Sequence, residues 1–384
     1  MFQILLAIIY LSFIGLGLPD SLLGGAWPDM YQQFGVPLSY AGIISSIISI
    51  GTIVSSFMSD RLTLKFGTGK ITAISVAMTA VALLGFAFSN SFILLCLWAI
   101  PYGFGAGSVD ASLNNYVALH YESRHMSWLH CMWGVGAAVG PYILGFALTR
   151  GLGWNSGYLI VSIIQIILAV ILFISLPLWK TRKTDAESGE VRKPLSLMEI
   201  LRIRGAKEVL ICFFCYCAIE QTAGLWASSY LNLHKSIPVD TAASFASMFF
   251  IGITVGRAVD GFLTMKLSNT KMIRLGFVLI LAGIVVMVIP APSWLALAGL
   301  IIIGLGCAPV YPCIIHSTPA HFGEDKSQAI IGVQMAFAYL GILVMPPLFG
   351  VIANAVSIAL LPYYLLILLV LMVVSHEALI KATE

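Results

Sequence analysis

The chain has 384 residues, of which 59% are hydrophobic and only 10% are charged, with a formal net charge of +3. Soluble domains carry about 25% charged residues, because most of their surface faces water. This composition excludes a soluble globule of this size and favours a protein surrounded by membrane lipid. The small net charge gives no sign of a nucleic-acid partner.

Twelve apolar segments follow one another along the chain, each close to the ~20 residues that a helix needs to cross a bilayer. Short turn signals such as Ser89-Asn90-Ser91 separate most of them. We therefore predict an all-α integral membrane protein with twelve transmembrane helices. The segments lie near residues 3–30, 39–59, 71–89, 91–119, 126–149, 157–178, 207–232, 241–265, 271–290, 294–318, 327–350 and 356–378.

One connection differs from the others because it is long and charged. Residues 179–206 contain basic side chains from Lys180 to Arg204, interspersed with acidic ones, at the midpoint of the chain. We therefore predict an N-terminal six-helix half at 1–178, a cytoplasmic linker at 179–206 and a C-terminal six-helix half at 207–384.

Lysine and arginine are distributed unevenly between the two sides of the predicted membrane. When the connections are numbered alternately, Arg150 and Lys235 are the basic residues opposite the N-terminal side, and Arg257 lies within a span. The rest of the 20 Lys and Arg residues fall on the N-terminal side. Because basic loops stay in the cytoplasm, we predict a multi-pass protein of the cell membrane with both termini cytoplasmic. This orientation requires an even number of spans.

An internal repeat relates the two predicted halves. Two six-helix repeats of the same orientation are typical of transporters that move a solute through a site near the middle of the membrane. The coinciding residues include, at a shift of 201 residues, Gly51 with Gly252, Gly103 with Gly304 and Gly105 with Gly306, and, at a shift of 200, Asp20 with Glu220.

A run of charged residues and glycines follows the second span: Ser56-x-x-x-Asp60-Arg61-x-x-x-Lys65-x-Gly67-x-Gly69-Lys70. This run resembles the loop signature of the major facilitator superfamily, with Ser56 where glycine is usual. Other stretches resemble the fucose-galactose-glucose/proton symporter branch and the related glucose transporter-like proteins. The resemblance implies the major facilitator fold and secondary transport by alternating access. These stretches are Gly103-x-Gly105-x-Gly107-x-x-Asp110-x-x-x-Asn114, His130-x-x-x-Gly134-x-Gly136-x-x-x-Gly140-Pro141, Glu220-x-x-x-Gly224-x-Trp226-x-x-x-Tyr230-Leu231, Gly252-x-x-x-Gly256-Arg257 and Gly304-x-Gly306-x-Ala308-Pro309-x-x-Pro312.

Ionisable residues within the predicted spans are costly to insert, so each is a candidate functional residue. Asp20 in span one and Asp110 in span four lie beside glycines, and the resemblance implies that acidic residues on these spans couple protons and bind substrate. Glu220 holds the repeat-related position in span seven. We predict that Asp20, Asp110 and Glu220 carry protonation. The alternative is a carboxylate held in a static hydrogen-bond network between helices.

Two further pairs of charges are predicted to act as gates. Arg257 and Asp260 stand three residues apart in span eight, so they share a helix face and are expected to pair with each other. A purely structural ion pair is the alternative. Asp60 and Arg61 belong to the loop signature, in which the family clamps its halves through charges at helix ends.

Amide and aromatic side chains within the spans are candidates for contact with the substrate. Sugars present apolar faces that pack on aromatic rings and hydroxyl groups that bond to amides. Asn114 follows Asp110 by one helical turn, and Gln334 coincides with Trp133 at the shift of 201. For each ring the alternative is simple packing. The predicted substrate-binding residues are Asn114, Asn115, His130, Trp133, Gln221, Trp226 and Gln334.

The sequence thus predicts a proton-coupled transporter of a small neutral solute, with the resemblance favouring a monosaccharide. One rival is a drug or metabolite exporter of the same fold, with an apolar cavity. Another is a membrane-embedded sensor or enzyme. No phosphate-binding loop, nucleophile motif or metal-ligand spacing occurs in a loop large enough to hold such a site, and the seven cysteines are interpreted as packing residues. We therefore expect no enzyme activity, no metal and no cofactor, and a monomer that binds substrate, proton and lipid.

Overall fold

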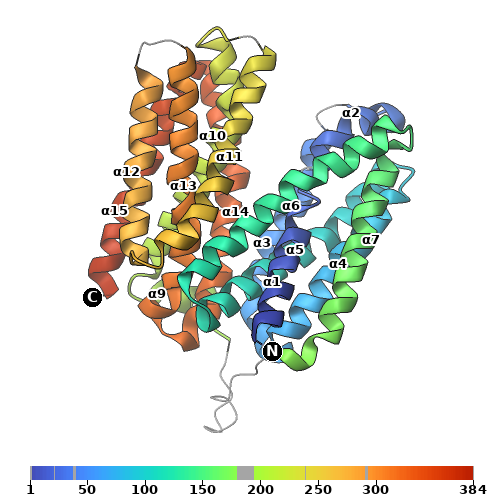
Figure 1. Cartoon of the computed structure of the whole chain (residues 1–384), viewed down its shortest axis with the longest axis horizontal. Helices are drawn as coiled ribbons and strands as arrows, with labels where there is room; N and C mark the ends of the chain where they lie inside the picture. Colours follow the sequence, from blue (N-terminus) through green and yellow to red (C-terminus); the bar gives the residue numbers. More distant parts are fainter. Residues whose placement is uncertain are drawn as a thin grey trace. The chain divides into compact units, whose positions relative to one another are not determined.

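The computed structural model describes residues 2–20, 22–37, 40–179, 194–237, 239–289 and 293–383, with side chains described for all of these except residues 2, 239–247, 293 and 294. The charged part of the expected linker, 180–193, lies outside the described residues. Across the described residues the chain forms helices joined by turns, without a strand (Figure 1), which confirms the predicted fold class.

The helices correspond to the apolar segments expected from the sequence. Among the described residues, eleven helical stretches are long and apolar enough to cross a membrane, the first running through α1 and α2 from Gln3 to Phe34. With the 25-residue α11, they account for the twelve predicted spans. The helices are α1 (Phe2–Gly17), α2 (Leu22–Phe34), α3 (Ala41–Phe66), α4 (Thr68–Ala87), α5 (Phe92–His120), α6 (Ser123–Thr149), α7 (Gly153–Ile174), η2 (Leu176–Leu178), α9 (Leu197–Arg202), α10 (Ala206–Leu233), α11 (Val239–Leu263), α12 (Asn269–Val288), α13 (Ser293–Phe322), α14 (Glu324–Ala355), η3 (Ile358–Leu360) and α15 (Leu361–Thr383).

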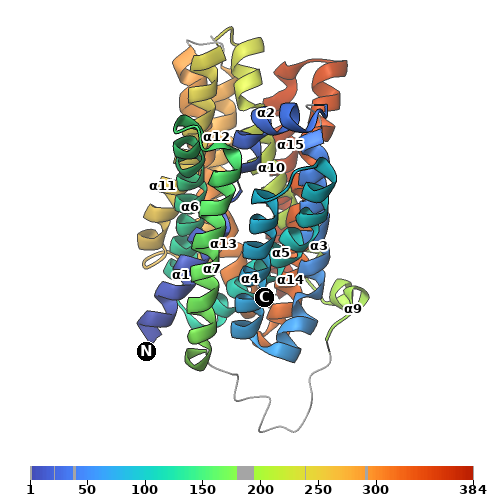
Figure 2. The same cartoon turned by 90° about the vertical axis from the view of Figure 1, so that its right-hand side faces the viewer.

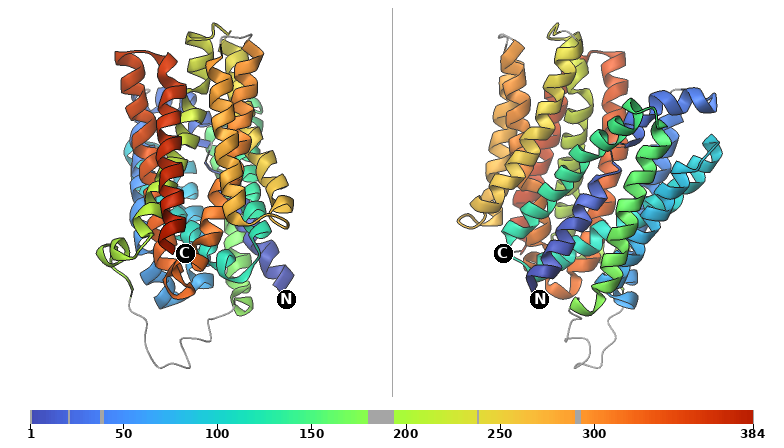
Figure 3. Two further views of the ribbon diagram at one scale, coloured as in Figure 1. Left: turned by 90° about the vertical axis from the view of Figure 1, so that its left-hand side faces the viewer. Right: turned by 45° about the vertical axis from the view of Figure 1, so that its right-hand side comes forward.

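The chain divides into two compact units. Unit 1 comprises Met1–Tyr116 and Met132–Leu195, and unit 2 comprises Val117–Cys131 and Ser196–Glu384. In unit 1, α7 packs along α4 and also contacts α1 and α2. In unit 2, α13 packs against α11 and α12, and α10 packs against α14 and α15. Figures 1 and 3 show these helices of unit 2 running side by side.

Helix α6 begins in unit 2 and ends in unit 1. Its first turns are fastened to unit 2 by Trp128, whose Nε1 donates a hydrogen bond to the carbonyl oxygen of Ala258 at 3.2 Å. The indole fills the space beside Gly261, where a Cβ atom would come within 2.0 Å of Nε1. Just before α6, the carbonyl oxygen of Tyr121 accepts a hydrogen bond from His316 Nε2 at 2.9 Å. The segment that joins α5 to α6 therefore attaches to α11 and α13.

The internal repeat is visible in how glycines pack at helix crossings. In unit 1, a Cβ atom on Gly103 of α5 would meet the carbonyl oxygen of Ile48 in α3 at 2.3 Å. In unit 2, a Cβ atom on Gly304 of α13 would meet the carbonyl oxygen of Phe249 in α11 at 2.3 Å. Both members of the second contact lie 201 residues after those of the first. Because small residues let helix backbones approach closely, the same tight crossing is built into both units.

Alanine at either crossing should destabilise the protein. Gly103→Ala and Gly304→Ala each place a methyl group against a backbone carbonyl, which cannot move aside as the end of a side chain can. Overpacking of this kind costs about 1–3 kcal/mol, so each variant should melt several degrees below the parent protein in detergent. Gly145→Ala is the control, because a Cβ atom there meets nothing within 4 Å. If both variants have the same melting temperature as the control, the backbones do not cross closely at these glycines.

Candidate functional site

Helix α1 ends at a proline in the middle of the first span. Pro19 has no N–H, so the carbonyl oxygen of Gly15, four residues earlier, loses its helical hydrogen bond. The side-chain amide of Gln165 in α7 donates a hydrogen bond to this carbonyl oxygen. The break leaves Asp20 in the turn before α2, with its backbone N–H bonded to the carbonyl oxygen of Gly17 at 3.2 Å.

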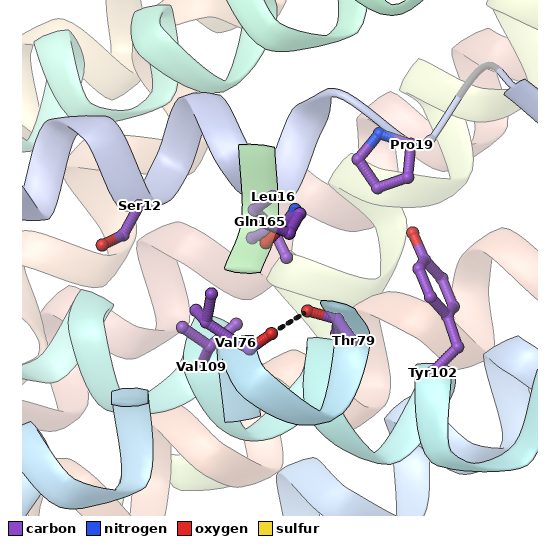
Figure 4. Close-up of a pocket in the computed structure, with 8 residues that line it drawn as sticks. All are labelled: Ser12, Leu16, Pro19, Val76, Thr79, Tyr102, Val109 and Gln165. Carbon is purple, nitrogen blue, oxygen red and sulfur yellow. Dashed lines mark hydrogen bonds between the residues drawn. The ribbon is translucent and has the colours of Figure 1, made fainter. Parts of the chain in front are cut away.

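A small pocket lies beside this break, within unit 1. Figure 4 shows the hydroxyl group of Tyr102 pointing toward Pro19 across the pocket. The hydroxyl group of Thr79 donates to the carbonyl oxygen of Val76 at 2.9 Å. The pocket is lined by Ser12, Leu16, Pro19, Val76, Thr79, Tyr102, Val109 and Gln165.

The two carboxylates predicted for proton coupling in unit 1 lie near each other. Asp20 is exposed, and its Oδ2 accepts a hydrogen bond from Trp133 Nε1 at 2.9 Å. Asp110 is close enough to act on Asp20 electrostatically. The Asp110 side chain is buried, and Asn114 Nδ2 donates to its Oδ1 at 2.7 Å. Unit 1 therefore brings together four of the predicted site residues, and the neighbouring Asn115 is buried on the same helix.

A second polar cluster is buried in unit 2. Glu220 Oε2 accepts a hydrogen bond from the hydroxyl group of Tyr216 and lies 3.5 Å from Arg257 Nη2. Arg257 Nη2 also donates to the Tyr216 oxygen at 3.3 Å. The side chains of Arg257 and Glu220 are only 4% and 9% exposed. The cluster is thus an ion pair almost completely shielded from solvent, and Tyr216 forms a hydrogen bond with each partner.

The ion pair at Arg257 differs from the one expected from the sequence. Its carboxylate partner is Glu220 on α10, whereas the spacing along α11 suggested Asp260. Residues three apart share a face of a helix, but the partner on that face is set by the helix packed against it, here α10. Asp260 Oδ2 is buried and has no hydrogen-bond partner among the described residues.

Tyr311 of α13 connects His130 to this cluster. The guanidinium carbon of Arg257 lies 5.9 Å from the centroid of the Tyr311 ring, a cation–π distance. The His130 ring packs edge to face with the Tyr311 ring, with centroids 4.4 Å apart. The hydroxyl group of Tyr311 donates to Met335 Sδ at 3.1 Å. His130, a predicted substrate ligand, thus belongs to unit 2, whereas Asp20 and Asp110 belong to unit 1.

The remaining predicted substrate ligands have partners of their own or stand apart from these contacts. Trp226 Nε1 donates to the carbonyl oxygen of Pro346 at 2.9 Å, and Pro346 is one of two adjacent prolines within α14. Gln334 is fully buried, and its Oε1 accepts a hydrogen bond from Thr318 at 3.1 Å. Gln221 is half-buried on α10.

The predicted gate residues of α3 lie at the end of that helix. Asp60 is buried, and its Oδ2 accepts a hydrogen bond from the backbone N–H of Leu195 at 3.4 Å. Arg61 is exposed. The Asp60 contact ties the part of the linker just before α9 to α3 within unit 1.

Sequence reasoning did not select four residues that complete these clusters. Tyr216 could have been found, because it precedes Glu220 by one turn and so shares its helix face. Gln165 also left a signal, since it is an amide within a span of mean hydropathy 2.8. Tyr102 and Tyr311 left none, because a tyrosine in an apolar span is indistinguishable from a packing residue. Among the described residues no group of three or more His, Cys, Asp or Glu side chains is placed to hold a metal.

Comparison with known proteins gives consistent matches. The family model described as Major Facilitator Superfamily matches residues 9–238 and 209–383. Bypass of stop codon protein 6 of Saccharomyces cerevisiae is 24% identical over 284 residues, 68% of this chain and 57% of that protein. The chain therefore spans little more than half the length of that relative.

Two sugar transporters are also similar to the chain. The glucose/mannose transporter GlcP of Bacillus subtilis is 20% identical over 310 residues, covering 79% of this chain and 77% of GlcP. The fucose:proton symporter FucP of E. coli superimposes with a TM-score of 0.79 at 17% sequence identity, covering 99% of each chain. At this identity the likeness to FucP shows a shared fold.

Removing one member of the buried ion pair should destabilise the protein more than removing both. Glu220→Gln or Arg257→Gln alone takes away the counter-charge of a buried group, which costs about 3–5 kcal/mol. The double variant leaves neutral side chains, so its melting temperature should recover in large part. The matched control is the exposed pair Arg274–Glu377, 2.7 Å apart with side chains 51% and 38% exposed, where the same changes should matter little. Additive losses in the 220/257 double variant would contradict a desolvated pair.

Proposed function

The chain belongs to the major facilitator superfamily, and we propose that this secondary transporter uses a proton gradient to move a neutral monosaccharide. The observation that carries the proton part of the proposal is an excess of carboxylates over cations within the spans. The observation behind the substrate part is the combination of aromatic, amide and carboxylate groups in unit 1.

The excess of carboxylates follows from the residues that the structure buries. The buried acidic residues among those described are Asp60, Asp110, Glu220 and Asp260, and the basic one besides histidine is Arg257. Charge within the hydrocarbon costs several kcal/mol. Desolvation favours the neutral form of a carboxyl group. Carboxylates that take up and release protons during the cycle meet this requirement.

The polar groups of unit 1 suit a ligand that carries hydroxyl groups on an apolar ring. Trp133 offers an aromatic face whose N–H is already bonded to Asp20, and Asn114 and Asp110 offer hydrogen-bonding groups one turn apart on α5. Such a mixture is typical of sugar sites. The names of GlcP and FucP support the same substrate class. An exporter of lipophilic drugs would instead favour an apolar cavity.

The remaining parts of the proposal come from the sequence. We place both termini in the cytoplasm because of the uneven distribution of Lys and Arg, with halves at 1–178 and 207–384 joined by the linker at 179–206. Gln221, Trp226 and Gln334 remain proposed substrate ligands, and Asp60, Arg61, Arg257 and Asp260 remain proposed gate residues. A monomer in the cell membrane is the simplest unit that satisfies these assignments.

Asp110→Asn should uncouple transport from the proton gradient. The amide keeps the size of the side chain but cannot exchange a proton, so accumulation of labelled sugar in proteoliposomes with an imposed pH gradient should be lost. Counterflow of labelled sugar, which needs no net proton movement, should survive in part. Asp29→Asn, at an exposed position of α2, is the control and should accumulate sugar normally. Normal accumulation and an unchanged pH profile in Asp110→Asn would remove this residue from the coupling path.

Sugars should stabilise the purified protein against heat, because a ligand that binds the native state raises its melting temperature. We expect glucose, galactose or fucose to raise the melting temperature and a lipophilic cation to have no effect. Trp133→Ala should weaken the binding of whichever sugar stabilises the protein about tenfold, which corresponds to roughly 1.4 kcal/mol. If the cation stabilises the protein and none of the sugars does, the assignment of a sugar substrate is wrong, and the drug exporter is the better hypothesis.

A further inference from the structure

Helix α9 (Leu197–Arg202) is held in one orientation just before α10. The hydroxyl oxygen of Ser196 accepts a hydrogen bond from the backbone N–H of Glu199 at 3.3 Å, and Glu199 Oε2 accepts one from the backbone N–H of Ser196 at 2.7 Å. The hydrogen bond from the Ser196 hydroxyl group lowers the pKa of Glu199, so this reciprocal cap persists at neutral pH. Ile200 is 2% exposed, and α9 packs on α10 and α14.

Two apolar side chains of α9 are exposed. Met198 is 61% exposed, and Leu197, three residues before Ile200 and on the same side of the helix, is 42% exposed. Two residues along a helix correspond to about 200°, so Met198 points away from the buried Ile200. Arg202 follows Met198 by four residues and shares its face. Figures 2 and 3 show α9, a short yellow-green helix, at the edge of the long helices of unit 2.

Exposed basic side chains continue from this face to the start of the next span. Arg202, Arg204 and Lys207 are all exposed. Of the nearby acidic residues, Glu199 is engaged in the helix cap and Glu208 is half-buried. Gly205, with a φ of 86°, turns the chain between α9 and α10 in a conformation that favours glycine. The turn keeps α9 at the end of the span instead of extending it.

We propose that α9 is an interfacial helix that binds anionic phospholipid at the membrane surface. Leu197 and Met198 enter the boundary between headgroups and acyl chains, and Arg202, Arg204 and Lys207 contact lipid phosphate groups. Because α9 directly precedes the membrane-spanning helix α10, the apolar side chains of α9 lie at this boundary. An amphipathic helix with adjacent basic residues is the combination that anionic membranes bind. The occupant is lipid because the exposed side chains match a headgroup layer in both polarity and charge.

A fluorescent label on α9 tests this proposal without a transport assay. Met198→Cys in a background without other cysteines, labelled with an environment-sensitive nitrobenzoxadiazole dye, is reconstituted into phosphatidylcholine vesicles and into equimolar phosphatidylcholine and phosphatidylglycerol. We expect shorter-wavelength emission and quenching by spin-labelled lipid, both stronger in the anionic vesicles. Emission typical of water and no quenching in either vesicle would overturn the proposal and would leave the proposed transport function untouched.

Charge removal separates lipid binding from simple proximity to the bilayer. The triple variant Arg202→Gln, Arg204→Gln, Lys207→Gln should lose the difference between the two vesicle compositions. The matched control removes three other exposed lysines, Lys266, Lys271 and Lys326, by the same change to glutamine and should keep the difference. In detergent, added phosphatidylglycerol should raise the melting temperature of the parent and the control but not of the triple variant. Equal behaviour of the two triple variants would refute a specific role for α9.

Discussion

A hydrocarbon interior offers the peptide backbone no hydrogen bonds, so every break in a transmembrane helix must be satisfied by another part of the protein. In unit 1, the carbonyl oxygen of Gly15 that Pro19 leaves without a donor is bonded by Gln165 from α7. In unit 2, α14 continues as a helix across Pro346 and Pro347, and Trp226 of α10 donates a hydrogen bond to the carbonyl oxygen of Pro346. The break in α1 is thus satisfied by a side chain from a neighbouring helix. This break is what allows Asp20 to leave the helix and meet Trp133.

The same medium explains why the two units share a scaffold but differ in chemistry. Glycines at equivalent positions bring α3 against α5 and α11 against α13 to the same distance, because close backbone approach depends only on the absence of a side chain. The polar residues follow no such constraint. Unit 1 places the carboxylates of Asp20 and Asp110 near each other, with Asp20 bonded to an indole. Unit 2 pairs Glu220 with Arg257, whose guanidinium group contacts the ring of Tyr311. A repeated backbone can therefore carry two different functional groups.

Sequence predicted well those features that depend on a single helix. The length of the apolar segments located the spans, and the four-residue spacing put Asp110 and Asn114 one turn apart, where the structure shows them hydrogen-bonded. Features that depend on which helix packs against which were missed. The spacing of Arg257 and Asp260 defined a helix face, but the packing of α10 on α11 supplied Glu220 as the partner. Likewise, nothing in the sequence around His130 indicates that the start of α6 belongs with unit 2.

The proposed function requires unit 1 both to exchange a proton and to bind a sugar, and Trp133 takes part in both. Its N–H donates a hydrogen bond to Asp20 at 2.9 Å, and the strength of that bond depends on the charge of the carboxyl group. A hydrogen bond to an ionised acceptor is roughly twice as strong as one between neutral groups. Proton uptake neutralises Asp20 and would therefore weaken its hydrogen bond with the Trp133 indole. If the ring is the platform for a sugar, this single hydrogen bond links the binding of the proton to the binding of the sugar.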